Sequence, residues 1–113
     1  MDQPEQMSAV RWAFAEHHVV NSFHAHVEVL IDHLKTAALL NAGARSELLE
    51  DYSDRPEGHR KLLLGYVGPD WPVHIVIDVD AFEADFSEPI MVVTAYRPEP
   101  PEWPDELTRR GQR

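Results

Sequence analysis

The sequence predicts an α+β domain in which N-terminal helices pack on one face of a three- to four-stranded, mainly antiparallel sheet. Apolar residues recur at helical spacing up to Gly43, and after it they fall into short runs typical of strands. Short turn sequences separate most of those runs, so successive strands are expected to pair antiparallel. The apolar stripes of the helices then have one surface to cover, which is a face of the sheet.

The first residues of the chain predict a short amphipathic helix. Residues 8–16 place the apolar side chains of Val10, Phe14 and Trp12 among small helix formers, with Ser8 as the N-cap. Residues 17–22 are short and β-branched, and they predict either a connector or a small edge strand.

A second helix is expected to begin at Ser22, which is a suitable N-cap. Its apolar positions have helical spacing and are Phe23, Val27, Leu30, Ile31 and Leu34. A third, shorter helix is expected over residues 36–43, capped by Thr36 and ended by the segment from Asn41 to Gly43.

The rest of the chain predicts strands joined by turns. The strand-like segments are residues 46–52, 61–66, 73–79 and 90–96. Turn residues mark 53–59 and 67–72, and an acidic loop covers 78–88. Prolines forbid a regular element directly after the last strand, at Pro98, Pro100, Pro101 and Pro104.

The length of 113 residues is enough for one domain and too short for two ordinary ones. The chain is expected to divide into an N-terminal helix and connector at 1–21, an α+β core at 22–97, and a proline-rich acidic tail at 98–113.

The formal net charge of -10 argues against a broad phosphate-binding surface. Residues 78–88 and 98–106 together hold nine acidic residues and no basic one, so the remainder of the chain is close to neutral. A local cationic site therefore stays open, beside the simpler reading that the acidic segments serve solubility.

The chain has no cysteine, which excludes disulfides, thiolate nucleophiles and cysteine-based zinc sites. No apolar run approaches the ~20 residues of a membrane span, and the acidic, polar N-terminus does not resemble a signal peptide. A cytoplasmic protein without membrane contact is expected.

One histidine lies inside the strongest strand. Alternation over residues 73–79 places Val73, Ile75 and Ile77 on the core face, and His74 on the face away from the helices. If Thr94 and Tyr96 share that face, the three side chains form a polar cluster on the sheet. The alternative is a solvated histidine on an open sheet face.

Five motifs in order along the chain resemble domain-of-unknown-function family 4258. They are SFHA (22–25), EDYSDRP (50–56), LLLGY (62–66), PVHIVI (72–77) and TAYRPEPPEW (94–103). The resemblance implies the fold of the RelE/barnase-like toxin superfamily, whose members include small ribonucleases of toxin–antitoxin systems. It also implies that His24 and His74 match the two characteristic histidines of the family, and that Tyr96 and Arg97 match its terminal motif. Glu28 departs from the pattern, because relatives usually have an arginine there.

This resemblance leads to the hypothesis of metal-independent RNA cleavage. His24 and His74 would act as general acid and base, because the pKa of histidine lies near neutrality, with Tyr96 beside them. Cations would hold the phosphate, and the candidates are Arg97, Arg60 and Lys61. No cofactor is expected, and the seven histidines lack metal-ligand spacing, so no metal is expected either.

The competing hypothesis is a non-catalytic protein-binding module or an inactive relative of such toxins. The expected partner classes are RNA for the ribonuclease, an antitoxin-like protein for either, and a second copy in a homodimer. The surface at His74 separates the two hypotheses. A positive pocket containing His24, His74 and Arg97 favours the ribonuclease, and a negative or filled one favours the module.

Overall fold

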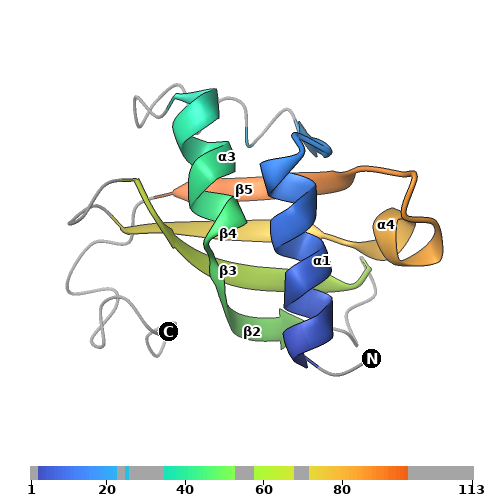
Figure 1. Cartoon of the computed structure of the whole chain (residues 1–113). Coiled ribbons are helices and arrows are strands. Elements are labelled where there is room, and N and C mark those ends of the chain that lie inside the picture. The colour runs from blue at the N-terminus through green and yellow to red at the C-terminus, as the bar shows by residue number, and fades with distance from the viewer. Residues whose placement is uncertain (1–2, 23–24, 26–34, 53–57, 68–71, 97–113) are drawn as a thin grey trace.

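Five strands form one mixed sheet, and two helices cross one of its faces (Figure 1). The computed structural model describes residues 3–22, 25, 35–52, 58–67 and 72–96. The helices are α1 (Gln3–Ala15), α3 (Thr36–Ala44) and the short α4 (Asp80–Ala84); the strands are β1 (Val19–Asn21), β2 (Glu47–Tyr52), β3 (Arg60–Tyr66), β4 (Pro72–Asp78) and β5 (Ile90–Tyr96).

The strand order in the sheet is β1-β5-β4-β3-β2. Strands β2 to β5 pair antiparallel in succession, as the short turns predict. The expected number of three to four strands is too low, because the segment after α1 forms β1 and pairs parallel with β5, with Val19 opposite Ile90. The sheet is therefore mixed. Strand β2 is its other edge, and a register shift between Leu48 and Glu50 interrupts its pairing with β3.

The observed helix starts correct two of the predicted caps. Helix α1 begins at Gln3, so Ser8 lies inside it; Pro4 in the first turn fits an earlier start, because proline needs no hydrogen bond there. In α3 the N-cap position belongs to Lys35, which makes no side-chain capping bond, and Thr36 is the first helical residue.

The helix expected after Ser22 lies outside the described residues except for Ala25. Its predicted cap has the expected geometry, because the Ser22 hydroxyl oxygen accepts a hydrogen bond from the Ala25 backbone N–H at 3.1 Å. The acidic segment at 78–88 is not entirely a loop, since it contains α4.

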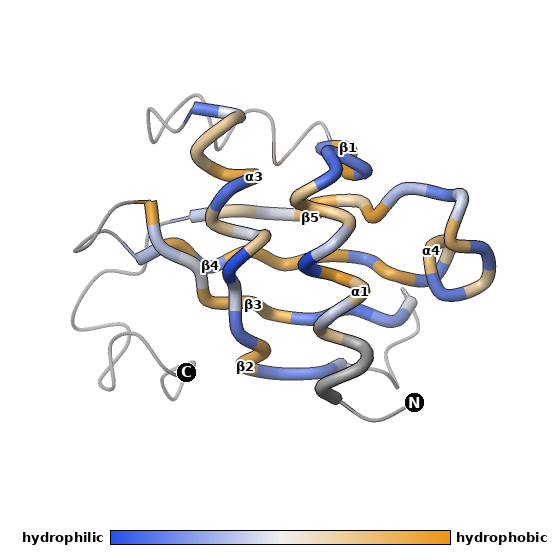
Figure 2. Tube along the Cα trace, viewed as in Figure 1, coloured by the Kyte–Doolittle hydropathy of each residue, from blue (hydrophilic) through white to orange (hydrophobic). Residues whose placement is uncertain are grey.

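The hydrophobic core lies between the sheet and the helices. Apolar residues run along the middle of β3 and β4 (Figure 2). The core includes Val73, Ile75 and Ile77, which were predicted for the inner face of β4, together with Val10 and Phe14 of α1. Its further members are Met7, Ala13, Ala25, Leu39, Leu63, Val79, Phe82, Ile90, Val92 and Ala95. Helix α1 therefore shares one core with the strands.

The opposite face of the sheet is also closed to solvent at its centre. Leu62 and Leu64 of β3 and His74 of β4 are all buried, and none of the three belongs to the core on the helical side. Within the part of the chain that the structure describes, no helix is both long and apolar enough to cross a bilayer.

Candidate functional site

His74 lies on the sheet face predicted for it, but it is enclosed. The register places it between Leu64 of β3 and Tyr96 of β5. Its ring packs edge-on against the ring of Tyr96, with 5.6 Å between centroids and 61° between planes. The expected sharing of one face by His74 and Tyr96 is confirmed.

The expectation of a solvent-open histidine is wrong, because the exposed fraction of His74 is 0%. The buried side chains of Leu62 and Leu64 on the same face explain part of this result. A continuous run such as LLL in residues 62–64 is typical of a strand buried on both faces. That run was the signal in the sequence that this face excludes water.

Arg60 and Lys61, the two predicted cations within the described residues, do not gather around His74. Lys61 projects to the helical side of the sheet, where it is 1% exposed, and its ammonium group lies 2.8 Å from Asp51 Oδ2. Arg60 projects to the other face at the far end of β3, opposite Asp78, and its Nε lies 3.9 Å from Asp78 Oδ2. Neither residue is placed to meet a phosphate beside His74.

His24 and Arg97 lie outside the described residues, but Ser22, the first residue of the SFHA motif, is described. The Ser22 backbone N–H donates to the Val92 carbonyl at 2.9 Å, and the Ser22 hydroxyl donates to the Val93 carbonyl at 3.0 Å. The start of the motif is therefore fixed to β5, the strand that also carries Tyr96.

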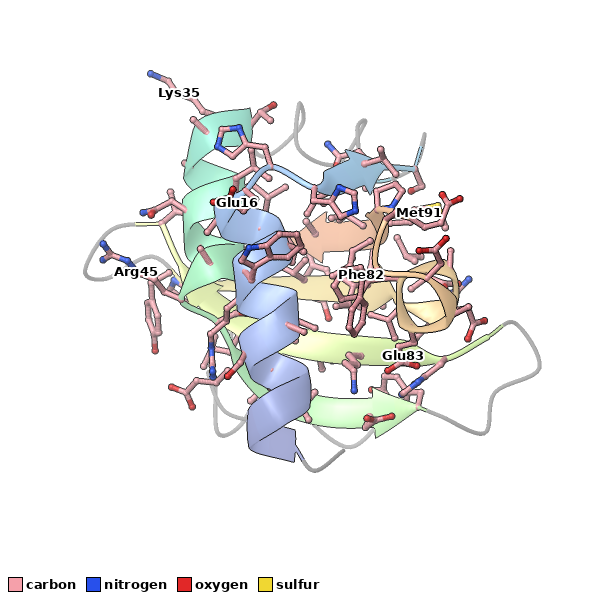
Figure 3. All side chains as sticks on the ribbon, turned by 45° about the vertical axis from the view of Figure 1, so that its right-hand side comes forward. Glu16, Lys35, Arg45, Phe82, Glu83 and Met91 are labelled. Atoms are coloured by element: carbon pink, nitrogen blue, oxygen red, sulfur yellow. The ribbon has the colours of Figure 1, made fainter. Side chains whose placement is uncertain are left out.

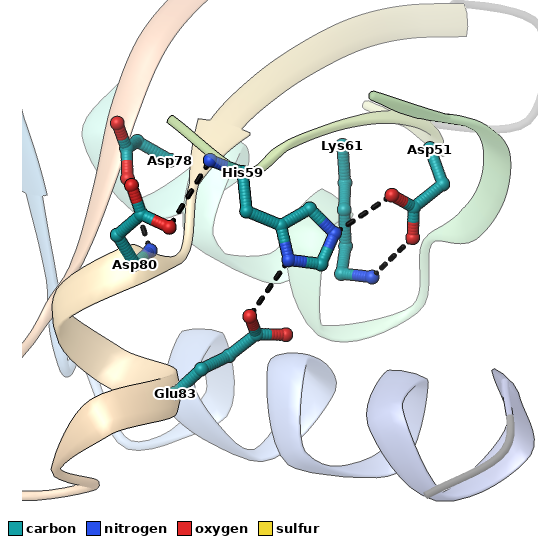
Figure 4. Close-up of polar contacts among 6 residues, drawn as sticks. All are labelled: Asp51, His59, Lys61, Asp78, Asp80 and Glu83. Carbon is teal, nitrogen blue, oxygen red and sulfur yellow. Dashed lines mark hydrogen bonds and ion pairs between the residues drawn. The ribbon is translucent and has the colours of Figure 1, made fainter. Parts of the chain in front are cut away.

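A charged cluster at the other end of the sheet was not predicted (Figure 4). His59 lies between two carboxylates: its Nδ1 is 2.7 Å from Glu83 Oε1, and its Nε2 is 2.7 Å from Asp51 Oδ1. Its backbone N–H donates to Asp80 Oδ1 at 3.1 Å. Together with the Lys61 ion pair, these contacts join β2, α4 and the segment that begins β3. We call Asp51, His59, Lys61 and Glu83 the His59 cluster.

Electrostatics in the His59 cluster favour the charged forms. Burial alone would lower the pKa of His59, but the hydrogen bonds to Glu83 and Asp51 outweigh burial and raise it. Burial alone would raise the pKa of Asp51, but hydrogen bonds from Lys61 and His59 lower it. Both ring nitrogens of His59 are engaged by carboxylates, so the cluster links β2, α4 and the start of β3.

Aromatic side chains form a second unpredicted feature, on the helical side (Figure 3). The rings of Trp12, His18, Phe82 and Phe86 follow one another with centroid separations of 5.9, 6.3 and 4.9 Å. Trp12 lies off the buried stripe of α1, and Phe86 comes four residues after Phe82. In the sequence, only the position of Trp12 and the four-residue spacing of the two phenylalanines indicated this arrangement. Among the described residues, no group of histidines and carboxylates has an arrangement that could hold a metal ion.

The comparisons with known proteins give one finding. A family model described as a domain of unknown function (DUF4258) matches residues 22–97, which includes every strand except β1. That description names no activity and no superfamily. Neither the curated proteins nor the solved structures gave a significant match to the chain.

Proposed function

Because the chain belongs to the DUF4258 family of domains of unknown function, its activity has to be inferred from its own surface, and we propose that it is a protein-binding module for a basic partner, with no chemistry of its own. One observation carries this proposal: the predicted catalytic His74 and the predicted phosphate ligand Lys61 are both enclosed, at 0% and 1% exposure. A catalytic acid or base has to reach the proton that it transfers, directly or through one water.

The charges at the surface support a basic partner. Exposed acidic residues occur on several elements and include Glu16, Glu47, Asp80, Glu83, Asp85 and Glu88. Several of the described cations already have partners within the protein. Arg11 donates a hydrogen bond to the Ser46 carbonyl at 2.8 Å. Lys61 is paired with Asp51, and Arg60 lies beside Asp78. With a net charge of -10, long-range attraction favours the approach of a positively charged protein.

In this proposal the chain is related to the RelE/barnase-like toxins but lacks their activity. Toxins of that superfamily usually carry the basic surface in a toxin–antitoxin pair, and this chain carries the opposite charge. An inactive relative that binds a basic protein fits both the fold class and the charge.

A ribonuclease of toxin type is the second candidate, because one observation favours it. The hydrogen bonds of Ser22 to Val92 and Val93 hold the start of the SFHA motif on β5, where Tyr96 contacts His74. Ser22, two residues before His24 in the sequence, is thus tied to the strand next to His74. For RNA to reach His74, the side chains that enclose it would have to move.

Induced expression in bacteria separates the two candidates, with growth and RNA integrity followed. The module predicts normal growth and intact RNA. The ribonuclease predicts RNA loss that disappears in His74→Gln, which keeps side-chain volume, while His17→Asn, a change at an exposed histidine, has no effect. Circular dichroism of both variants confirms that each is folded. RNA loss that depends on His74 would reject the module.

A direct binding test complements the expression test. We expect a synthetic hexapeptide of alternating glycine and arginine to bind the purified chain, and its affinity to fall as salt rises, because exposed charges are screened. A hexapeptide of alternating glycine and glutamate is the matched control and should not bind. Equal binding of the two peptides would contradict a preference for basic partners.

A further inference from the structure

The aromatic row, which we define as Trp12, His18, Phe82 and Phe86, joins parts of the chain that are far apart in sequence. Helix α1 supplies Trp12, the segment after α1 supplies His18, and α4 with the segment after it supplies the two phenylalanines. His18 Nε2 lies 3.2 Å from the Phe86 carbonyl oxygen. A carbonyl oxygen can only accept a hydrogen bond, so Nε2 carries the donated proton. This hydrogen bond joins the segment after α1 to the segment after α4.

Two rings of the aromatic row face solvent. Trp12 is 51% exposed and Phe86 is 53% exposed, whereas Phe82 between them is buried and anchors the row. The described residues include four exposed large hydrophobic side chains, and two of them lie in this row. Neighbouring exposed rings are typical of an interaction surface, whereas single exposed apolar residues are common everywhere.

Acidic side chains accompany the aromatic row. Glu16 lies one helical turn after Trp12, Asp85 directly precedes Phe86, and Glu88 follows it; all three are exposed. The backbone and hydroxyl of Ser87 donate hydrogen bonds to Asp85, and these bonds lower the pKa of its carboxyl. Glu83 belongs to the His59 cluster, so its charge is already matched by His59.

The nearby cations do not neutralise this surface. Arg11 is next to Trp12 in sequence, but its guanidinium donates to the Ser46 carbonyl, which precedes β2. Lys61 lines a small cavity beside Phe82 and Phe86, but it is enclosed and paired with Asp51. Within the part of the chain that the structure describes, no cation pairs with Glu16, Asp85 or Glu88, so these carboxylates and the exposed rings are both present at the surface.

We infer that the aromatic row binds an arginine side chain of a basic protein segment, an inference that rests on the proposed function and names its site. A guanidinium is planar, stacks on aromatic faces and pairs with carboxylates, so it matches both components of the surface. The cavity beside the row has a volume of about 20 Å³, which suits one water molecule and not a guanidinium. An arginine therefore stacks on the exposed ring of Trp12 or of Phe86 from outside and does not enter this cavity.

Nuclear magnetic resonance tests this inference with the glycine–arginine hexapeptide. The indole N–H signal of Trp12, identified by its loss in Trp12→Phe, should shift on titration. A peptide with citrulline in place of arginine has nearly the same shape without the charge, and it should leave the signal unchanged. Trp12→Ala and Phe86→Ala should each weaken binding about two- to fivefold, the size expected for a stacked cation at an exposed ring.

The matched control is Tyr66→Ala. Tyr66 is also an exposed aromatic residue, at 40%, but it lies at the end of β3 opposite Pro72, whereas α4 follows the other end of β4. This variant should bind the arginine peptide as the wild type does.

The outcomes distinguish the site from the general function. If the arginine peptide binds while the Trp12 signal stays in place and Trp12→Ala keeps full affinity, the protein-binding module stands and the aromatic row is not its site. Equal shifts with the citrulline peptide would overturn the recognition of a cation. If no peptide binds, this inference and the proposed function both fail.

Discussion

At the scale of single residues, His17 shows how α1 is ended. His17 has a φ of 60°, in the left-handed region that glycine adopts most easily. The His18 N–H donates to the Ala13 carbonyl at 2.7 Å, and the His17 N–H donates to the Phe14 carbonyl at 3.2 Å. These two bonds are the Schellman pattern, in which the left-handed residue is usually glycine. The turn also returns the chain so that His18 reaches Trp12.

The first prediction concerns this turn. His17→Gly should raise the free energy of unfolding by about 1 kcal/mol, because the left-handed conformation costs an L-residue more than it costs glycine. Chemical denaturation measures the change. His17→Ala is the control and should not stabilise the protein, since alanine shares the steric penalty. Equal effects of glycine and alanine would show that the backbone conformation is not the cause.

The buried Lys61 leads to a second prediction at this scale. Asp51→Ala should lower the free energy of unfolding by about 2 kcal/mol, because it removes the carboxylate 2.8 Å from a buried ammonium group. Lys61→Met should change it by less than about 1 kcal/mol, because the carboxylate left behind, Asp51, is 27% exposed and still paired with His59, so no charge is left buried without a partner. Urea denaturation of both variants compares them. A larger loss in Lys61→Met would contradict this account.

Lys61 also shows why the candidate site was hard to predict. The sequence placed it correctly in a strand, but alternation alone assigns a lysine in an apolar strand to solvent. Its partner, Asp51, lies on a neighbouring strand, and its position depends on the β2–β3 register. His59 is a similar case, because Asp51 and Glu83 reach it from separate elements. Such convergence is a tertiary property that spacing in one chain does not show.

At the scale of elements, the close approach of α3 to β3 depends on glycine. A Cβ atom at Gly65 would lie 2.6 Å from the Ala42 carbonyl oxygen, which is backbone and has little room to move. A Cβ atom at Gly43 would instead meet the ring of Phe14 at 2.2 Å. Glycines at these two positions let α1, α3 and the sheet pack against one another at short range.

The third prediction uses the difference between these two clashes. Gly65→Ala and Gly43→Ala should each lower the free energy of unfolding by about 1–3 kcal/mol, the usual cost of overpacking. Adding Phe14→Leu should recover part of the loss in Gly43→Ala, because it removes the clashing ring, and none of the loss in Gly65→Ala. A double-mutant cycle measures this coupling. Equal rescue of both variants would contradict the geometry.

Most helices and strands could be predicted from the local pattern of apolar residues, and the exceptions have physical reasons. Strands β2 to β5 were placed within a residue or two, because alternating or continuous apolar runs bounded by turns are strong signals. The three residues of β1 carry too little pattern to distinguish a strand from a connector, and their parallel pairing depends on β5, far away in sequence. Helix α4 was missed because five residues give no periodicity.

At the scale of the whole molecule, the His59 cluster makes stability depend on pH. The folded state raises the pKa of His59 above its ordinary value of 6.5, so its contribution is complete below pH 6.5 and is lost as pH rises through the raised value. The folded state lowers the pKa of Asp51 below 3.8, so its contribution is complete above pH 3.8 and is lost as pH falls through the lowered value. These two groups together favour the interval between pH 3.8 and 6.5.

The fourth prediction follows from this interval. The urea midpoint of the wild type should decline as pH rises above 6.5, and His59→Gln should remove the part of that decline that the cluster causes. Glu83→Gln is the graded control, because His59 then loses one of the two carboxylates that raise its pKa, so the decline should be smaller and should end at a lower pH. An unchanged alkaline decline in His59→Gln would show that other groups control it.

The outer edge of the sheet has a consequence for how copies of the chain can meet. Strand β2 offers its backbone along the edge, but the shift in pairing between Leu48 and Glu50 breaks the regular row of hydrogen-bonding groups. Acidic side chains at Glu47 and Glu50 add repulsion between identical chains. Proteins use irregular pairing and charged side chains at edge strands to prevent open-ended polymerisation through strand pairing. In concentrated solutions the β2 edge should therefore not seed fibrils, and any self-association has to use a different surface.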